Sequence, residues 1–364
     1  MKTIFDKNTF NRALELASKF SSGRISSIQS LQGVLLKGEK GHLHFYSSNL
    51  NSFFHTKIKA ENEKDFSILV EPKKINEYIN YLPGSKIEIE AGEKQLVISQ
   101  EKTRGTFPIM NQADFPLPPE IKEKKQTIKT AFLKTNLPLI LFSAAQDESR
   151  PTLTGVNFIS GESQLTMVTT DGFRLSLIKT DKQTGWPSFI VPATFLEEIQ
   201  RLIFDKEEVA FAYSSEEKLL YFSDGKNEFF SRLIEGEFPA FEKVIPEKTT
   251  TRVVLDKEEL LRGVKQASVF ARDLANVILL NFKKEEISIK PKTETEENQT
   301  IIEGEVEGEP QKVAFNYKFL VEFLNRAESN KITIEILRPD APIIFRVDKK
   351  PNYLHLIMPV RIQE

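Results

Sequence analysis

The stretch Asp6-Lys7-Asn8-Thr9-Phe10-Asn11-Arg12-Ala13-Leu14 carries the pattern on which the chain is built. From Phe10, apolar side chains recur through Ala17 with the spacing i, i+3, i+4, i+7, which predicts a helix with one buried face. The same opening returns as Asp256-Lys257-Glu258-Glu259-Leu260, 250 residues further on. A helix start repeated in this way indicates that the chain contains copies of one folding unit.

A middle copy of this helix is expected near residue 130, where apolar residues form a similar stripe: Leu133, Leu137, Ile140, Leu141 and Ala144. Pro138 falls inside the stripe, and proline is tolerated best in the first turn of a helix. We therefore expect Thr135 or Asn136 to cap this helix, with its start shifted along the chain.

A second helix signal also occurs three times, each time after a short strand-like run. Its apolar positions are Ile75-Tyr78-Ile79-Leu82, Phe195-Leu196-Ile199-Leu202-Ile203 and Phe319-Leu320-Phe323-Leu324. Alternating patterns typical of strands follow each helix, at residues 86–90 and 95–99, 208–213 and 218–222, and 331–336 and 343–347. Each copy is therefore predicted to be a helix, strands, a second helix and more strands, an α+β fold.

Prolines gather at residues 115–119 and 238–246, where two boundaries are expected. The predicted domains are residues 1–119, 120–246 and 247–364, each within the normal domain size. The acidic stretch from Glu294 to Glu309 is interpreted as a loop, roughly Pro291 to Gln299, followed by a solvent-facing strand.

The composition narrows the possible functions. The 364 residues include no cysteine, which excludes disulfides and thiolate chemistry and suits a reducing cytosol. Neither a signal peptide nor a membrane span is apparent, so a cytoplasmic protein is expected. The net charge of −2 is unusual for a protein that grips DNA by its phosphates, so nucleic acid would be held weakly or topologically.

Four segments carry the most distinctive motifs: Arg150-Pro151-Thr152-Leu153-Thr154-Gly155-Val156, Thr169-Thr170-Asp171-Gly172-Phe173-Arg174-Leu175-Ser176, Ser231 to Pro239, and Met358-Pro359-Val360-Arg361-Ile362. Read alone, Asp171-Gly172 is a turn dipeptide and could be a hairpin tip and nothing more. Taken in order on a threefold repeat, the four segments resemble the bacterial DNA polymerase sliding clamp family, the polymerase III beta subunits.

This resemblance implies three tandem clamp domains, each with two helices packed on antiparallel sheets, forming half of a closed ring. Two chains would join head to tail as a homodimer and encircle double-stranded DNA without sequence preference. The replicative polymerase, the clamp loader, and repair and translesion polymerases would bind through linear peptides. No catalytic activity, cofactor, metal or membrane is implied.

The resemblance also assigns site residues. A client-peptide groove between the second and third domains would be lined by Leu153, Thr170, Gly172, Phe173, Arg174, Leu175, Pro239, Lys243, Val244, Met358, Pro359, Val360, Arg361 and Ile362. Phe173 and Lys243 stand where the family usually has His and Arg, so this groove is expected to be more apolar and to prefer different peptides. Gln363-Glu364 extend past the usual end of the chain.

Arg24 matches a position where the family contacts DNA. For the dimer, Val269 and Phe270 are expected to meet the strand that holds Phe107 and Ile109. The alternative is that each pair packs inside its own domain, because obligate interfaces resemble cores in composition.

Two other functions compete with the clamp. A hydrolase could use Asp171 or the acidic pair Asp147-Glu148, or a metal bound by His42 and His44, which share one face of a strand. No further ligand at a suitable spacing completes such a site, and surface positions are expected for all four histidines. The third possibility is a three-repeat scaffold that binds partners without encircling DNA.

Overall fold

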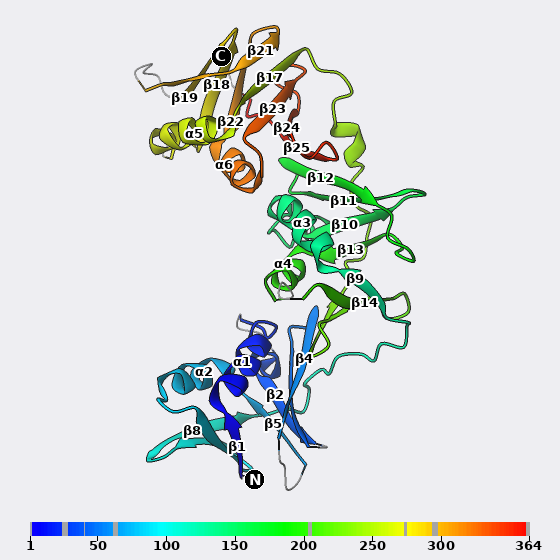
Figure 1. Ribbon diagram of the computed structural model, residues 1–364, viewed down its shortest axis with the longest axis vertical. Coiled ribbons are helices and arrows are strands. Elements are labelled where there is room, and N and C mark those ends of the chain that lie inside the picture. Colours follow the sequence, from blue (N-terminus) through cyan, green and yellow to red (C-terminus); the bar gives the residue numbers. More distant parts are fainter. Residues whose placement is uncertain are drawn as a thin grey trace. The chain divides into compact units, whose positions relative to one another are not determined.

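The computed structural model describes residues 2–23, 28–39, 41–60, 65–202, 206–272, 275–292 and 298–361. The chain forms two compact units, shown with the course of the chain in Figure 1. The first unit comprises Met1–Phe132 and Glu198–Leu233, and the second comprises Leu133–Glu197 and Ile234–Glu364. Two of the three divisions fall inside helices α3 (Thr130–Ile140) and α4 (Ala193–Leu202), so the segment expected as a middle domain contributes to both units. The boundaries at residues 119 and 246 stay predictions.

The first unit is built on a twelve-stranded antiparallel sheet. Its strands, in sheet order, are β1 (Lys2–Asp6), β6 (Lys86–Ala91), β7 (Gln95–Gln100), β8 (Thr103–Met110), β5 (Phe66–Val70), β2 (Val34–Glu39), β3 (His42–Ser48), β4 (Ser52–Lys59), β16 (Asn227–Arg232), β15 (Leu219–Ser223), β14 (Glu208–Ser214) and β9 (Gln126–Lys129). Helices α1 (Lys7–Ser18) and α2 (Pro72–Tyr81) pack side by side, and a 3₁₀ turn, η1, spans Gln29–Gln32.

The second unit contains a nine-stranded and a four-stranded antiparallel sheet. The larger runs β13 (Phe189–Pro192), β10 (Gly155–Ser160), β11 (Gln164–Thr170), β12 (Arg174–Asp181), β25 (Tyr353–Ile357), β24 (Ile343–Val347), β23 (Lys331–Ile336), β17 (Thr251–Asp256) and β21 (Glu305–Gly308). The smaller runs β20 (Thr300–Glu303), β19 (Glu286–Pro291), β18 (Val277–Lys283) and β22 (Gln311–Asn316). Helices α5 (Lys257–Ala271) and α6 (Tyr317–Arg326) pack together, and 3₁₀ turns η2, η3 and η4 span Leu141–Ser143, Pro151–Thr154 and Phe241–Val244.

The repeated helix opening is confirmed, and it works through the same cap in both copies. Asp6 Oδ1 accepts a hydrogen bond from the Thr9 backbone N–H at 2.8 Å, and Asp256 Oδ1 accepts from the Glu259 N–H at 2.9 Å. Each carboxylate satisfies an N–H that the first turn of a helix leaves without a partner. The buried face of α1 then places Phe10 between the rings of Phe5 and Phe45. The two helices therefore begin for one physical reason.

The expected start of the middle helix is wrong. Helix α3 begins at Thr130 and contains Pro138 near its end, so neither Thr135 nor Asn136 caps it. Thr130 is fixed directly after β9, because its backbone N–H donates to the Glu207 carbonyl at 2.9 Å. Pro138 lacks the N–H that would continue the ladder, and the chain passes into η2 three residues later.

The second helix of each copy is confirmed as α2, α4 and α6, and all six strand patterns that follow them are strands. Ile203, expected in the second of these helices, lies outside the described residues. The solvent-facing strand after the acidic loop is also confirmed, because in β20 Ile301 is exposed and Ile302 is buried. Most of that loop, residues 293–297, lies outside the described part of the chain.

Candidate functional site

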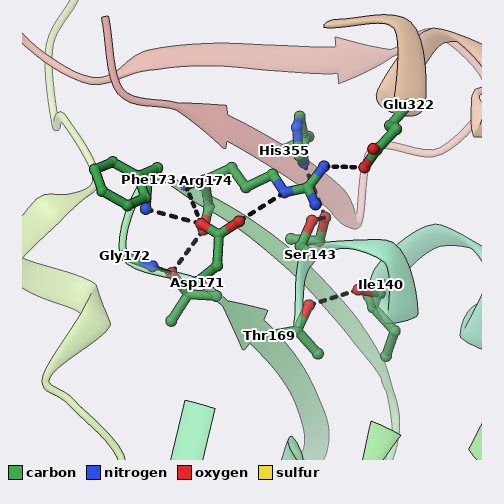
Figure 2. Close-up of polar contacts among 11 residues, drawn as sticks. Ile140, Ser143, Thr169, Asp171, Gly172, Phe173, Arg174, Glu322 and His355 are labelled. Atoms are coloured by element: carbon green, nitrogen blue, oxygen red, sulfur yellow. Dashed lines mark hydrogen bonds and ion pairs between the residues drawn. The ribbon is translucent and has the colours of Figure 1, made fainter. Parts of the chain in front are cut away.

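The turn between β11 and β12 is held by its own polar side chains, as Figure 2 shows. Asp171 Oδ1 accepts hydrogen bonds from the backbone N–H groups of Phe173 at 2.8 Å and Arg174 at 2.9 Å. Thr170 Oγ1 accepts from the Gly172 N–H and donates to the Arg174 carbonyl. Gly172 has φ +90°, a left-handed conformation that favours glycine. The predicted Asp-Gly turn is thus confirmed, and it leaves the Phe173 side chain 59% exposed.

Arg174 follows this turn but is itself buried, with 8% of its surface exposed. Its Nε donates to Asp171 Oδ2 at 3.0 Å, and its Nη1 forms an ion pair with Glu322 of helix α6 (Figure 2). The guanidinium also lies over the rings of Phe319 and Phe142, 4.7 and 5.6 Å from their centroids. A buried cation needs such partners, and here two carboxylates and two aromatic faces supply them.

A buried polar cluster lies beneath Arg174. His355 of β25 shares a hydrogen bond with Ser176 Oγ at 2.9 Å, and Ser176 bonds Ser143 Oγ at 2.7 Å. Burial lowers the pKa of His355 well below 6.5, and the nearby Arg174 cation acts in the same direction. The expectation that every histidine lies at the surface is wrong for His355, which is fully buried and stacks on Phe323 of α6.

The C-terminal segment, Met358 to Arg361, follows strand β25. Strand β25 pairs with β12, and beyond its end the Met358 N–H donates to the Phe173 carbonyl at 2.8 Å. The Val360 N–H donates to the Ala314 carbonyl of β22 at 2.8 Å. Met358 packs against the apolar cluster that contains Leu175, and Val360 packs against Val277, Leu279 and Ala314. This segment is therefore hydrogen-bonded both to the β11–β12 turn and to strand β22.

The other predicted groove residues fall into two groups. Pro239, Lys243 and Val244 are exposed in and before η4, whose Phe241 packs in the same cluster as Leu175. Leu153 is buried in η3, one turn after Arg150, whose guanidinium lies close over Gly172. Pro359 is partly buried and Arg361 is exposed, whereas Ile362 lies outside the described residues.

A cavity of about 400 Å³ lies beside the same apolar cluster. Its lining includes Ile159, Leu177, Phe241, Ile245 and Leu354. Among the predicted groove residues that the structure describes, none lines this cavity. The accessible features of the predicted site are thus the exposed tip of the β11–β12 turn and the exposed residues in and before η4.

Sequence reasoning missed three participants: Glu322, Phe319 and the buried His355. Glu322 pairs with Arg174, although its side chain remains 49% exposed. One signal was available, since Glu322 follows Phe319 by three residues and such positions neighbour each other on a helix. Nothing in the sequence joins Arg174 to a residue 148 positions away.

The predicted dimer residues lie on two elements. Val269 and Phe270 are exposed on α5, so they do not pack in the core of their own domain. Phe107 and Ile109 are partly buried on β8, and the Phe107 ring contacts Tyr78 of α2 at 5.4 Å. Arg24, the predicted DNA contact, lies outside the described residues.

His44, His55 and Glu228 form a hydrogen-bonded row on the twelve-stranded sheet. His44 Nδ1 lies 2.9 Å from His55 Nε2, and His55 Nδ1 lies 2.6 Å from Glu228 Oε2. Within the described ranges, no group of three or more His, Asp or Glu side chains is arranged to hold a metal ion. Burial, followed by the nearby His55, lowers the pKa of His44 to about 4, so its ring is neutral at pH 7.

A unit of helix, strands, second helix and further strands occurs three times along the chain, which is the architecture of a three-domain clamp protein. Family models of the DNA polymerase III beta subunit match the chain three times: the N-terminal domain at residues 1–119, the central domain at 127–240 and the C-terminal domain at 242–361. Because these matches span nearly the whole chain, the chain belongs to the DNA polymerase III beta subunit family, the sliding clamps.

Individual relatives agree with this assignment. The beta sliding clamp of Bacillus subtilis is 26% identical over 380 residues, which cover 99% of this chain and 100% of that one. The clamp of Synechococcus elongatus is 24% identical, with full coverage of both chains. Solved clamp structures from Thermotoga maritima and B. subtilis share the fold with TM-scores of 0.89 over both full lengths, at 22% and 25% identity.

The predicted fold class of three tandem clamp domains is therefore confirmed, as is the interpretation of the chain as a sliding clamp of DNA replication. The scaffold alternative is not supported. In the part of the chain that the structure describes, no helix is both long and apolar enough to cross a bilayer.

Proposed function

We propose that two copies of this chain close head to tail into a ring that encircles duplex DNA and tethers the replicative polymerase and other clients to it. The observation that carries this proposal is the threefold clamp unit, which supplies six α-helices within the described ranges of the chain. Twelve helices spaced about 10 Å apart would form a circle roughly 38 Å across and leave roughly 27 Å inside. Such a bore is wider than a B-form duplex.

A loose bore agrees with the charge of the chain. With a net charge of −2, the protein has no excess of cations to neutralise phosphates tightly, and tight pairing would oppose sliding. We assign Arg24 as one DNA contact within this scheme, because it matches the family position. Retention would then depend on topology more than on affinity.

Client proteins would bind at the groove between the second and third domains. Its walls would combine the exposed ring of Phe173, the exposed Val244 of η4, and Met358 beside Leu175. Apolar walls with a few polar groups suit a short peptide with an aliphatic or aromatic anchor. The replicative polymerase, clamp loader, and repair and translesion polymerases would compete for this one site.

Ring closure would use the exposed Val269 and Phe270 of one chain against Phe107 and Ile109 of the other. Different patches on the two ends of a chain give a heterologous contact, which closes into a ring when the rotation completes a circle. In this scheme the protein acts in the cytoplasm, without catalysis and without a cofactor.

Two exposed phenylalanines provide a matched test, because Phe173 is 59% and Phe270 is 49% exposed. Phe173→Asp should abolish binding of a labelled peptide with a leucine–phenylalanine anchor and leave the dimer intact in sedimentation velocity. Phe270→Asp should produce monomers that still bind this peptide. If both substitutions change the same property, the assignment of two separate surfaces is wrong.

A further inference from the structure

Arg174 joins the tip of the β11–β12 turn to a helix that begins 143 residues later in the chain, α6. Its Nε bonds Asp171, whose other carboxylate oxygen accepts the N–H groups of Phe173 and Arg174. Its Nη1 pairs with Glu322. The backbone of the tip, the Arg174 side chain and α6 therefore form one connected set of polar contacts (Figure 2).

The two carboxylates have different surroundings. The Arg174 and Asp171 side chains are 9% and 16% exposed, whereas Glu322 is 49% exposed. The guanidinium lies between the Phe319 ring and the Phe142 ring, so it cannot move toward solvent without losing both contacts. Removal of the Glu322 charge would leave a buried cation with one carboxylate, and the Asp171 carboxylate would have to serve it alone.

Such a loss would reach Phe173 through the backbone. Asp171 holds the Phe173 N–H, and the Phe173 carbonyl accepts the Met358 N–H at 2.8 Å. Gly172, at φ +90°, has no side chain to restrict the tip, although the Arg150 guanidinium lies close to it. The backbone from which the exposed Phe173 ring extends is therefore held by Asp171 and Met358, and Arg174 in turn holds Asp171.

The corresponding turn of the first unit, between β3 and β4, is held by a different set of contacts. Ser52 there follows the turn as Arg174 does here, and Leu50 at the tip has φ +73°. Arg232 of β16 holds that tip by donating from Nε to the Leu50 carbonyl at 3.1 Å. An Asp–Arg–Glu connection to a helix thus belongs to the turn that carries Phe173 and is not required to form such a turn.

We propose that Glu322 is a positioning residue of the client groove, acting through Arg174 and Asp171 on the direction of Phe173. This inference rests on the proposed peptide-binding function. It makes client affinity dependent on the charge of residue 322 through a contact path inside the protein.

The test measures the anisotropy of a fluorescein-labelled decapeptide that carries adjacent leucine and phenylalanine side chains. Glu322→Gln should weaken its binding roughly fivefold, the size expected for a partly exposed charge-assisted contact. Glu322→Asp should restore part of the affinity. Glu328→Gln is the matched control, because this glutamate follows α6, is 82% exposed and reaches Lys350 only at 3.9 Å. It should leave the affinity unchanged.

A double-mutant cycle with Phe173→Ala separates positioning from direct contact. If Glu322 acts by directing Phe173, Glu322→Gln should change affinity less than twofold once Phe173→Ala is present. Equal effects of Glu322→Gln in both backgrounds, or no effect in the parent chain, would overturn the inference. A parent chain that binds no such peptide while the Arg174–Glu322 pair is intact would instead contradict the proposed groove.

A spectroscopic measurement supports the same distinction. In protein labelled with fluorophenylalanine, the Phe173 resonance should shift in Glu322→Gln and remain in place in Glu328→Gln. An unchanged Phe173 resonance in Glu322→Gln, together with a loss of peptide affinity, would show that Glu322 acts elsewhere and would refute its positioning role.

Discussion

Two pairs of neighbouring strands, called strand joints below, have matching backbone pairing. The side chains at their matching central positions differ in polarity. In the first unit β4 pairs with β16, and in the second β12 pairs with β25. Each joint ends with the same extra contact, from the Arg232 N–H to the Asn51 carbonyl and from the Met358 N–H to the Phe173 carbonyl, both at 2.8 Å. The backbone pairing alone therefore does not dictate the side chains.

At the centre of the face that packs against helices, the pair of the first joint is apolar and the pair of the second is polar. Phe54 opposes Phe229 in the first joint, and their rings lie 5.3 Å apart beside Phe20. At the corresponding places of the second joint, Ser176 opposes His355. Ser176 bonds both His355 Nδ1 and Ser143, whereas the buried Nε2 of His355 has no hydrogen-bond partner among the described residues.

On the opposite face the order is reversed. On that face, one row across the first joint is polar and consists of Tyr46, His55 and Glu228. The matching row across the second joint is apolar and consists of Val168, Leu177 and Leu354. The Tyr221 hydroxyl donates a hydrogen bond to Glu228 and accepts one from the Lys125 ammonium. Lys125 belongs to the segment that directly precedes β9. The apolar row is covered by Phe241 of η4. The connecting segment at the first joint is thus anchored by hydrogen bonds together with the packing of Ile121, and the one at the second joint by burial of Phe241.

The largest effect on stability is expected when a charged residue of the first joint replaces the matching apolar residue of the second. Leu354→Glu, which copies Glu228, places a carboxylate in the apolar cluster of Val168, Leu175 and Ile344. It should lower the free energy of unfolding of the second unit by about 3 kcal/mol or more. Fluorescence of Trp186, the single tryptophan of the chain, reports on this unit during urea unfolding.

The reciprocal change serves as its control. Glu228→Leu lies in the first unit and should leave the Trp186 transition where it is. A Leu354→Glu protein that unfolds within 1 kcal/mol of the parent would show that the apolar face of the second joint is not needed.

The next effect concerns pH. His355 stays neutral in the folded chain because burial holds its pKa well below 6.5, whereas the unfolded chain takes up a proton below about pH 6.5. The unfolded state thus binds more protons, and the stability of the second unit falls as the pH is lowered through this range. His355→Phe, which copies Phe229, should remove up to about 1.4 kcal/mol per pH unit from this slope.

Trp186 unfolding curves between pH 7 and pH 5 measure the slope. Ser176 keeps Ser143 as a partner in this variant, so no buried hydroxyl is left alone. His44 of the first unit, with its pKa lowered to about 4, should keep its own acid dependence. An unchanged Trp186 slope in His355→Phe would contradict the assignment of a neutral His355.

A smaller effect is expected from Glu228→Gln in the first joint. The substitution weakens the bond with His55 Nδ1 and leaves the Tyr221 contact possible, at a cost of about 1–1.5 kcal/mol. Hydrogen exchange of the β4 and β16 amides should become faster. Exchange that accelerates equally in β12 and β25 would indicate general destabilisation instead of a local weakening of the first joint.

The smallest effect is expected from Lys125→Met. The Lys125 ammonium bonds the Tyr221 hydroxyl at 2.9 Å and lies 4.3 Å from the ring centroid, but the side chain is nearly half exposed. Its removal should cost about 0.5 kcal/mol. Faster exchange at residues 126–129 of β9, with β4 unchanged, would identify an anchor for the connection; no change there would exclude one.

The sequence predicts the elements of this fold better than their joints. The repeated helix openings at Asp6 and Asp256 and the Asp171-Gly172 turn are local features, and both are confirmed. The start of α3 was missed because Thr130 is fixed by the Glu207 carbonyl, a contact between distant residues. The burial of His355 and the Arg174–Glu322 pair were missed for the same reason.

For the candidate site, the family motifs identified the exposed tip at Phe173 and the C-terminal segment, which the Met358 N–H joins. They did not indicate that Arg174 forms ion pairs with two carboxylates of the protein itself. A side chain that is polar and matches a groove motif can be committed to internal partners, and only the folded structure distinguishes the two cases.

Retention on DNA of defined topology tests the central claim most directly. The purified protein is loaded on nicked circular plasmid by a clamp loader, and the bound fraction is measured by gel filtration before and after one double-strand cut. The account predicts stable retention on the circle and rapid loss after linearisation, at a salt concentration where the protein does not bind linear DNA. Equal retention on circular and linear DNA, or none on either from a dimeric protein, would contradict it.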